Sequence, residues 1–128
     1  MPVSILSKQA LVLFAHGARD PRWAEPLARV QQMLELRVAA TVSIHQAFLE
    51  LMSPSLPQLL EQLIAQHVER VTIVPVFLGQ GGHVRRDLPE LIAKLEADYP
   101  QIHFSLAVAI GESEQVLQAI ADVCLAQL

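Results

Sequence analysis

Short apolar segments alternate along the chain with longer segments that have the apolar spacing of an amphipathic helix. Four segments of the first kind, residues 10–15, 41–50, 71–79 and 102–110, are each followed by one of the second. A strand-helix unit repeated four times implies a parallel sheet, because a strand that returns through a helix enters the sheet in the same direction. This alternation restricts the possible folds more than any other feature.

The composition of the strand segments predicts their order in the sheet. Residues 10–15 (ALVLFA) and 71–79 (VTIVPVFLG) are apolar almost throughout, which is typical of central strands covered on both faces. Residues 41–50 and 102–110 alternate apolar and polar side chains, which is typical of edge strands. We therefore predict a three-layer, flavodoxin-like α/β fold with a four-stranded parallel sheet in the order 2-1-3-4 and helices on both faces.

Several prolines fall near predicted boundaries. Asp20 before Pro21 fits a helix N-cap, and Pro26 either moves the helix start further along or kinks its first turns. Ser53-Pro54 is expected to open the second helix. Pro75 lacks an N–H for the sheet, which predicts a bulge or an offset pairing in the third strand.

The composition bounds the class of protein. The 128 residues suit a single domain over residues 1–128, and the hydrophobic fraction of 52% suggests that a partner covers part of the surface. The net charge of −4 argues against nucleic acid or a membrane as partner. One cysteine (Cys124), no apolar run of about 18–20 residues and no basic leader predict a soluble, cytoplasmic protein.

The predicted topology also locates a site. In an open parallel sheet, ligands bind beyond the carboxyl ends of the strands where the strand order reverses, here between the first and third strands. His16-Gly17 follows the first strand, and a glycine loop, Leu78-Gly79-Gln80-Gly81-Gly82-His83, follows the third. Both loops at this point therefore carry glycine and histidine.

The histidines suit metal or proton chemistry. Neutral imidazole is a common ligand for divalent transition metals and accepts a proton near neutral pH. If His83 lies near a helix N-terminus, the helix dipole disfavours imidazolium and leaves the nitrogen lone pair available. Glu50, after the second strand, can serve as a third ligand or as a base, although this spacing is not diagnostic of a metal site.

The glycine loop has two interpretations. It can be a phosphate cradle, but GQGGHVRRD matches neither the dinucleotide-binding glycine pattern nor a P-loop with its lysine. Alternatively, it is a flat backbone wall for a large planar ligand. Arg19, Arg85 and Arg86 lie close by in the sequence, and guanidinium groups bind carboxylates in bidentate fashion.

Three stretches, FAHGARDPRW, AFLELMSPSL and VPVFLGQGGHVRRDLPELI, resemble the small sirohydrochlorin chelatases of the CbiX/SirB type. The resemblance spans most of the chain, in the right order and spacing, and implies a single CbiX-like domain. It implies insertion of Co²⁺, or alternatively Fe²⁺ or Ni²⁺, into sirohydrochlorin, with the metal as substrate and no organic cofactor. It also implies a homodimer. The family often has serine where this chain has Ala18.

The resemblance implies a role for particular residues. His16 and His83 would bind the metal, and the catalytic set would be these two histidines with Glu50. The tetrapyrrole would contact a larger set: Arg19, Glu50, Leu78, Gly79, Gln80, Gly81, Gly82, His83, Arg85 and Arg86. Two alternatives stay open: a metal or tetrapyrrole carrier without catalysis, and a flavodoxin-like nucleotide or phosphoryl protein.

Overall fold

The computed structural model describes residues 7–79 and 81–128, and of His83 only the backbone. The strands are β1 (Gln9–Ala15), β2 (Val42–Phe48), β3 (Arg70–Pro75) and β4 (His103–Leu106). The helices are α1 (Glu25–Glu35), α2 (Leu56–Ala65), α3 (Gly82–Asp98) and α4 (Glu114–Leu125), with short 3-10 turns η2 (Pro21–Ala24) and η3 (Ile110–Glu112).

The sheet has the predicted topology. Its order is β2-β1-β3-β4 and all three pairings are parallel, so the first and third strands are central. Leu11 of β1 lies opposite Ile44 of β2 and Thr72 of β3, which fixes the faces on which neighbouring side chains lie. The predicted α/β class, strand order and strand direction are therefore confirmed.

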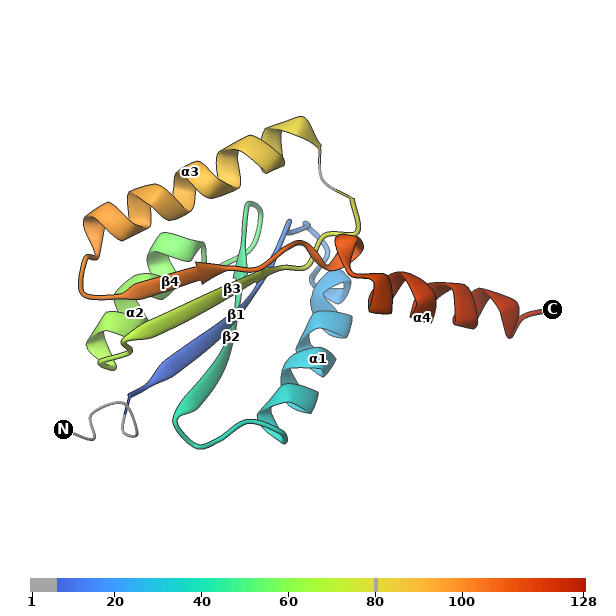
Figure 1. Ribbon diagram of the computed structural model, residues 1–128, viewed down its shortest axis with the longest axis horizontal. Coiled ribbons are helices and arrows are strands. Elements are labelled where there is room, and N and C mark those ends of the chain that lie inside the picture. The colour runs from blue at the N-terminus through green and yellow to red at the C-terminus, as the bar shows by residue number, and fades with distance from the viewer. Residues whose placement is uncertain (1–6, 80) are drawn as a thin grey trace.

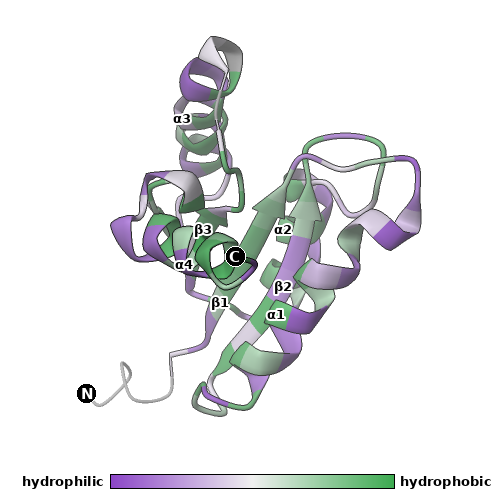
Figure 2. Cartoon of the chain, turned by 90° about the vertical axis from the view of Figure 1, so that its right-hand side faces the viewer, coloured by the Kyte–Doolittle hydropathy of each residue, from purple (hydrophilic) through white to green (hydrophobic). Residues whose placement is uncertain are grey.

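Two apolar clusters lie on opposite faces of the sheet. One joins β1 and β3 to the buried leucines of α2 and to α3. The other, smaller cluster joins β1 and β2 to α1. Figure 1 shows α4 covering neither face: it projects away from the sheet, and the C-terminus lies at its far end. The outer sides of α1 and α3 are hydrophilic, whereas the strands between them are largely apolar (Figure 2).

The helix starts differ in detail from the sequence-based expectations. Asp20 caps the turn η2 by accepting a hydrogen bond from the Arg22 backbone N–H. Helix α1 begins only at Glu25, so that Pro26 lies in its first turn, where a proline is tolerated. The prediction that Ser53-Pro54 opens the second helix is wrong. Ser55 is the N-cap of α2, because its side chain and that of Gln58 form a capping box.

Pro75 causes no bulge in the described register. It is the last residue of β3 and lies opposite Phe14 in the pairing with β1. A proline at a strand end removes fewer ladder hydrogen bonds than one in the middle, and the next residue, Val76, donates its N–H to the Phe14 carbonyl at 2.7 Å. The expected bulge or offset at Pro75 is therefore not observed.

No described helix is both long and apolar enough to cross a membrane.

Candidate metal and tetrapyrrole site

Backbone hydrogen bonds hold the loops after β1 and β2 together. The N–H groups of Leu49 and Glu50 donate to the carbonyls of Ala15 and His16, at 2.9 and 3.0 Å. Gly17 has a positive φ of 99°, and a Cβ atom there would lie 1.8 Å from the Glu50 carbonyl oxygen. Only glycine allows both this conformation and this close approach. The His-Gly dipeptide thus lets two neighbouring strand ends meet.

This contact places the side chains of His16 and Glu50 within hydrogen-bonding distance. His16 Nε2 lies 3.0 Å from Glu50 Oε1, and the two side chains are 52% and 56% exposed at the carboxyl edge of the sheet. A carboxylate oxygen only accepts hydrogen bonds, so this bond requires a hydrogen on Nε2. Nδ1 of the neutral ring then keeps a lone pair that can bind a metal ion or a proton.

His83 is the second residue of α3, a helix of 17 residues. Its backbone therefore lies in the first helical turn, two residues after the N-cap residue Gly81. The side chain of His83 lies outside the described part of the structure, as does the whole of Gln80.

A small pocket links the Glu50 loop to the start of α3. It has a volume of about 120 Å³ and is lined by Leu49, the neighbour of Glu50, by Val84, the neighbour of His83, and by Phe14 at the end of β1. Asp87, Leu88 and Leu91 complete its lining. The pocket is smaller than roughly 300 Å³, the volume at which ligand cavities begin. A large ligand would therefore have to lie outside it, across the exposed loops at the carboxyl edge of the sheet.

The glycine loop is exposed, and its described glycines are not required by packing. At Gly79, Gly81 and Gly82 a Cβ atom would meet no described atom within 4 Å, and none of the three has a positive φ. Leu78 is 67% exposed. Since nothing described in the chain demands glycine at these positions, the loop offers bare backbone to whatever approaches from outside.

The three arginines of the predicted site are exposed. None of them, Arg19, Arg85 or Arg86, forms an ion pair with an acidic side chain among the described residues. Arg22, which sequence reasoning did not select, pairs instead with Asp20 at 2.7 Å and lowers the pKa of that carboxyl group. The first two strand ends thus converge in the structure, and the three arginines remain available to an incoming ligand.

Sequence reasoning missed two structural positions. One is the contact of Gly17 with Glu50, for which a His-Gly pair directly after a strand was the available signal. The other is Gly111, which directly follows the fourth predicted strand segment, residues 102–110. Its N–H donates to the Phe77 carbonyl at 2.9 Å, and a Cβ there would lie 1.5 Å from the Leu78 carbonyl oxygen. The turn η3 therefore packs against the base of the glycine loop.

The described side chains do not form a closed metal cage. No three His, Cys, Asp or Glu side chains lie close enough together among them to hold an ion, and the side chain of His83 is outside that comparison. The geometry defines a class of protein: an α/β protein with an open, histidine-bearing site at the switch point of its parallel sheet.

Comparison with known proteins identifies the family within this class. The family model of CbiX matches residues 10–125, and the chain belongs to the CbiX family. It is 34% identical over 91 residues to the sirohydrochlorin cobaltochelatase of Methanococcus aeolicus, covering 70% of this chain and 62% of the relative. It is 27% identical over 113 residues to the sirohydrochlorin ferrochelatase of Bacillus subtilis, covering 88% and 43%. The match thus spans less than two thirds of the length of both relatives.

Solved structures agree with the fold. The CbiX protein of Marinobacter aquaeolei superimposes with a TM-score of 0.81 at 33% identity, covering 93% of this chain and 96% of that one. The sirohydrochlorin chelatase SirB of Bacillus subtilis subspecies spizizenii, solved in complex with cobalt, gives a TM-score of 0.74 at 30% identity and covers 90% and 49%.

Proposed function

We propose that this protein is a metal chelatase that inserts a divalent metal ion into sirohydrochlorin, with Co²⁺ as the expected ion and Fe²⁺ or Ni²⁺ as alternatives. The observation that carries the proposal is the exposed His16–Glu50 pair at the sheet edge that also bears the first turn of α3. Membership of the CbiX family and the names of its relatives support the same reaction.

The reaction needs a metal ligand and a base at one place. Insertion removes two pyrrole N–H protons from the macrocycle as one M²⁺ ion enters, so two protons leave and the charge balances. Two imidazoles, from His16 and His83, would hold the ion on an otherwise open coordination sphere and could release it, which a closed four-ligand cage would resist. After the ion has left, His16 Nδ1 can accept one of the protons.

The exposed loops at the carboxyl edge of the sheet fit a planar ligand with acidic groups at its periphery. A tetrapyrrole ring would lie across the bare backbone of Gly79, Gly81 and Gly82, where an added Cβ atom would meet no described atom within 4 Å. Arg19, Arg85 and Arg86 would then receive its peripheral carboxylates, because guanidinium groups bind carboxylates in pairs of hydrogen bonds. In this proposal Leu78 and Gln80 complete the contact with the ring.

The proposal is tested by anaerobic incubation of the protein with sirohydrochlorin and one metal ion at a time. We expect the absorption spectrum to change to that of the metal complex faster than in protein-free controls, for Co²⁺ first among Co²⁺, Fe²⁺ and Ni²⁺. Stoichiometric binding of metal or macrocycle without acceleration would instead support a carrier of the same fold and would contradict a chelatase.

Glu50 is expected to position His16 rather than to bind the ion. Glu50→Ala removes the hydrogen bond to Nε2 and should lower the insertion rate about 10- to 100-fold, the usual effect of losing a group that orients a ligand. Glu50→Gln keeps an acceptor oxygen at the same place and should restore most of that loss. Equal, complete inactivation of both variants in the insertion assay would show that the charge of Glu50 is needed directly.

Five further expectations from the sequence remain predictions: a single CbiX-like domain over residues 1–128, a homodimer, a cytoplasmic location, no organic cofactor, and no nucleic-acid or membrane partner.

A further inference from the structure

Two residues of the described chain that are not glycine have a left-handed backbone: Leu51, with a φ of 67°, and His67, with a φ of 61°. The end of helix α2 explains His67. Its N–H donates to the Ile64 carbonyl, and the N–H of Val68 donates to the Leu63 carbonyl, which is the bonding pattern that commonly closes a helix through a left-handed residue. Leu51 lies between β2 and α2, where no helix ends, so its conformation needs another reason.

Leu51 is the central residue of a tight turn that reverses the chain directly after Glu50. The Met52 N–H donates to the Glu50 carbonyl at 2.8 Å, across Leu51. Three-residue turns with a positive φ at their centre are rare and strained, and a bulky side chain makes this backbone conformation less favourable still. Glycine or asparagine adopts it more readily. The chain therefore has a leucine at a position where the backbone disfavours one.

No packing within the described chain offsets this strain. The side chain of Leu51 is 58% exposed and belongs to neither apolar cluster of the fold, whereas its neighbour Met52 packs against the smaller cluster beside α1. An exposed leucine gains little from the hydrophobic effect, because its surface stays in water. Unfavourable backbone conformations of this kind concentrate at binding and catalytic sites, where the strain serves the function.

The same turn fixes the backbone of Glu50, the residue that contacts His16. The Glu50 N–H donates to the His16 carbonyl, and the Glu50 carbonyl accepts the Met52 N–H and closely approaches Gly17. Both backbone groups of Glu50 are thus held. The position of Leu51 and that of the His16–Glu50 pair are therefore set by one piece of structure.

Exposed leucines flank the strand end that bears His16. Leu49 and Leu51, in the loop after β2, are 43% and 58% exposed, and Leu78, after β3, is 67% exposed. Strands β2 and β3 are the two neighbours of β1 and hence lie about 10 Å apart. The histidine proposed to bind the metal thus has exposed apolar side chains in the loops on both sides of its strand.

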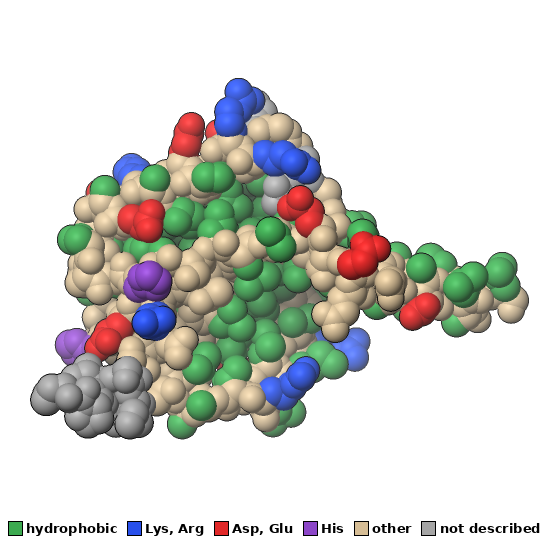
Figure 3. Space-filling view, viewed as in Figure 1, with side chains coloured by type: hydrophobic (Ala, Val, Ile, Leu, Met, Phe, Trp, Pro, Cys, Tyr) green, Lys and Arg blue, Asp and Glu red, His purple; other side chains and the backbone are tan. Residues whose placement is uncertain are grey.

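Basic side chains complete the chemistry of this edge of the sheet. Figure 3 shows Lys and Arg side chains over the first turns of α3, the helix that starts here, and the exposed Arg85 and Arg86 belong to these turns. A ligand would meet an imidazole and a carboxylate, apolar side chains beside them, and guanidinium groups. A tetrapyrrole has the matching parts: nitrogens at its centre, an apolar ring face, and carboxylates at its periphery.

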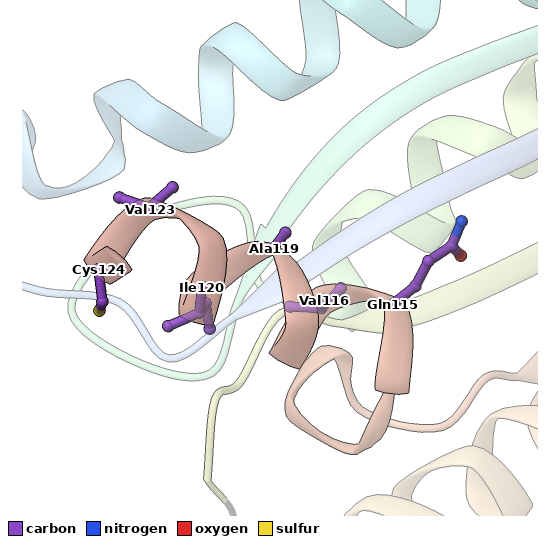
Figure 4. A pocket seen from close by; sticks show the side chains of 6 residues that line it. All are labelled: Gln115, Val116, Ala119, Ile120, Val123 and Cys124. Atoms are coloured by element: carbon purple, nitrogen blue, oxygen red, sulfur yellow. The ribbon is translucent and has the colours of Figure 1, made fainter. Parts of the chain in front are cut away.

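Another exposed apolar surface, on helix α4, lacks this combination. It is a shallow groove of about 450 Å³, and Figure 4 shows that its lining side chains all come from α4: Gln115, Val116, Ala119, Ile120, Val123 and Cys124. No histidine, arginine or carboxylate side chain is among them. The carboxyl edge of the sheet therefore matches a tetrapyrrole better than the groove of α4 does.

We propose that Leu51 is a binding residue for the tetrapyrrole, and that its side chain packs against the ring face beside the metal-binding histidine. This inference rests on the proposed function and adds a residue to it. In the free protein the strained turn and the exposed side chain lower stability, and burial of the leucine against the ring offsets this loss in the complex. The turn holds the side chain in place before the ligand arrives, so little freedom is lost on binding.

Equilibrium titration with metal-free sirohydrochlorin, followed under anaerobic conditions by the absorption spectrum of the macrocycle, tests this contact. Leu51→Asn removes the apolar side chain and introduces a residue that tolerates the left-handed backbone. It should raise the dissociation constant about 10-fold or more, the effect of losing the burial of one leucine, while the Tm stays at or above that of the wild type. Leu51→Met keeps an apolar side chain and should bind like the wild type.

Leu36→Asn is the matched control. Leu36 is 89% exposed and follows α1 shortly before β2 begins, which places it at the amino edge of the sheet, away from the proposed site. Its substitution should leave the affinity for sirohydrochlorin unchanged. Binding of Co²⁺ alone should be the same in the wild type and in Leu51→Asn, because Leu51 is not a metal ligand.

Two results would overturn the role of Leu51: wild-type affinity for sirohydrochlorin in Leu51→Asn, or a Tm of Leu51→Asn below that of the wild type, which would show that the leucine stabilises the free chain. A wild type that does not bind sirohydrochlorin would contradict the proposed function and this inference together. If the wild type binds the macrocycle without inserting metal, only the chelatase is contradicted, and a loss of affinity in Leu51→Asn still supports the contact.

Discussion

His16→Ala and His83→Ala should each slow metal insertion into sirohydrochlorin by about 10²- to 10⁴-fold, the range in which loss of a positioned proton acceptor falls. His16 is the imidazole that the Glu50 carboxylate orients, at 3.0 Å. His83 has its backbone in the first turn of α3, and the proposed reaction uses it as the second metal ligand. The measurement is the initial rate of the absorbance change under anaerobic conditions.

The control for this experiment is an exposed histidine elsewhere in the fold. His103 begins β4 and is exposed at the amino end of the sheet, opposite to the carboxyl edge that bears His16. His103→Ala should leave the rate unchanged, and circular dichroism should show the same fold for all three variants. Wild-type rates in His16→Ala and His83→Ala would remove the proposed mechanism.

Gly17→Ala should have the largest effect on stability among single substitutions at the site. The added Cβ would lie 1.8 Å from the Glu50 carbonyl oxygen, a backbone atom that cannot move aside cheaply, at a φ of 99° that alanine disfavours. We expect a loss of about 3 kcal/mol or more in the free energy of unfolding, or about 10 °C in Tm. Insertion activity should fall as well, because the His16–Glu50 pair depends on this close approach.

Gly79→Ala is the matched control for this substitution. Gly79 lies at the same edge of the sheet, but a Cβ there meets no described atom within 4 Å, so the thermal melt should be close to that of the wild type. A reduced insertion rate in a stable Gly79→Ala protein would support the view that the glycine loop faces a large ligand. A Gly17→Ala protein with wild-type Tm would show that the two loops separate without cost.

The sequence predicted the fold well because its signal is periodic and local. Apolar runs in residues 10–15 and 71–79 and alternation in residues 41–50 were sufficient for the strand order, since burial on one or two faces dictates side-chain pattern. Helix caps were predicted less well. Ser53 directly precedes Pro54 and Ser55 lies two residues before Pro57, so both serines are candidate caps, and the side-chain bonds of Ser55 with Gln58 distinguish them.

The places of the candidate site residues in the sheet could be predicted, but their contacts could not. The switch-point rule brought the loops after β1 and β3 to one edge, and the structure places Glu50 there too. The direct bond of Glu50 to His16 depends on the backbone contact at Gly17, a contact between residues distant in sequence, of which the His-Gly pair indicates one partner and not the other. The direction of α4 was equally unpredictable, because it follows from the packing of Gly111 against Leu78.

We propose that His16 and His83 hold one metal ion together, which X-ray absorption of the Co²⁺-loaded protein can measure. We expect two imidazole nitrogens in the first coordination shell of the wild type and one in each of His16→Ala and His83→Ala. A coordination shell that is identical in the wild type and both variants would contradict it.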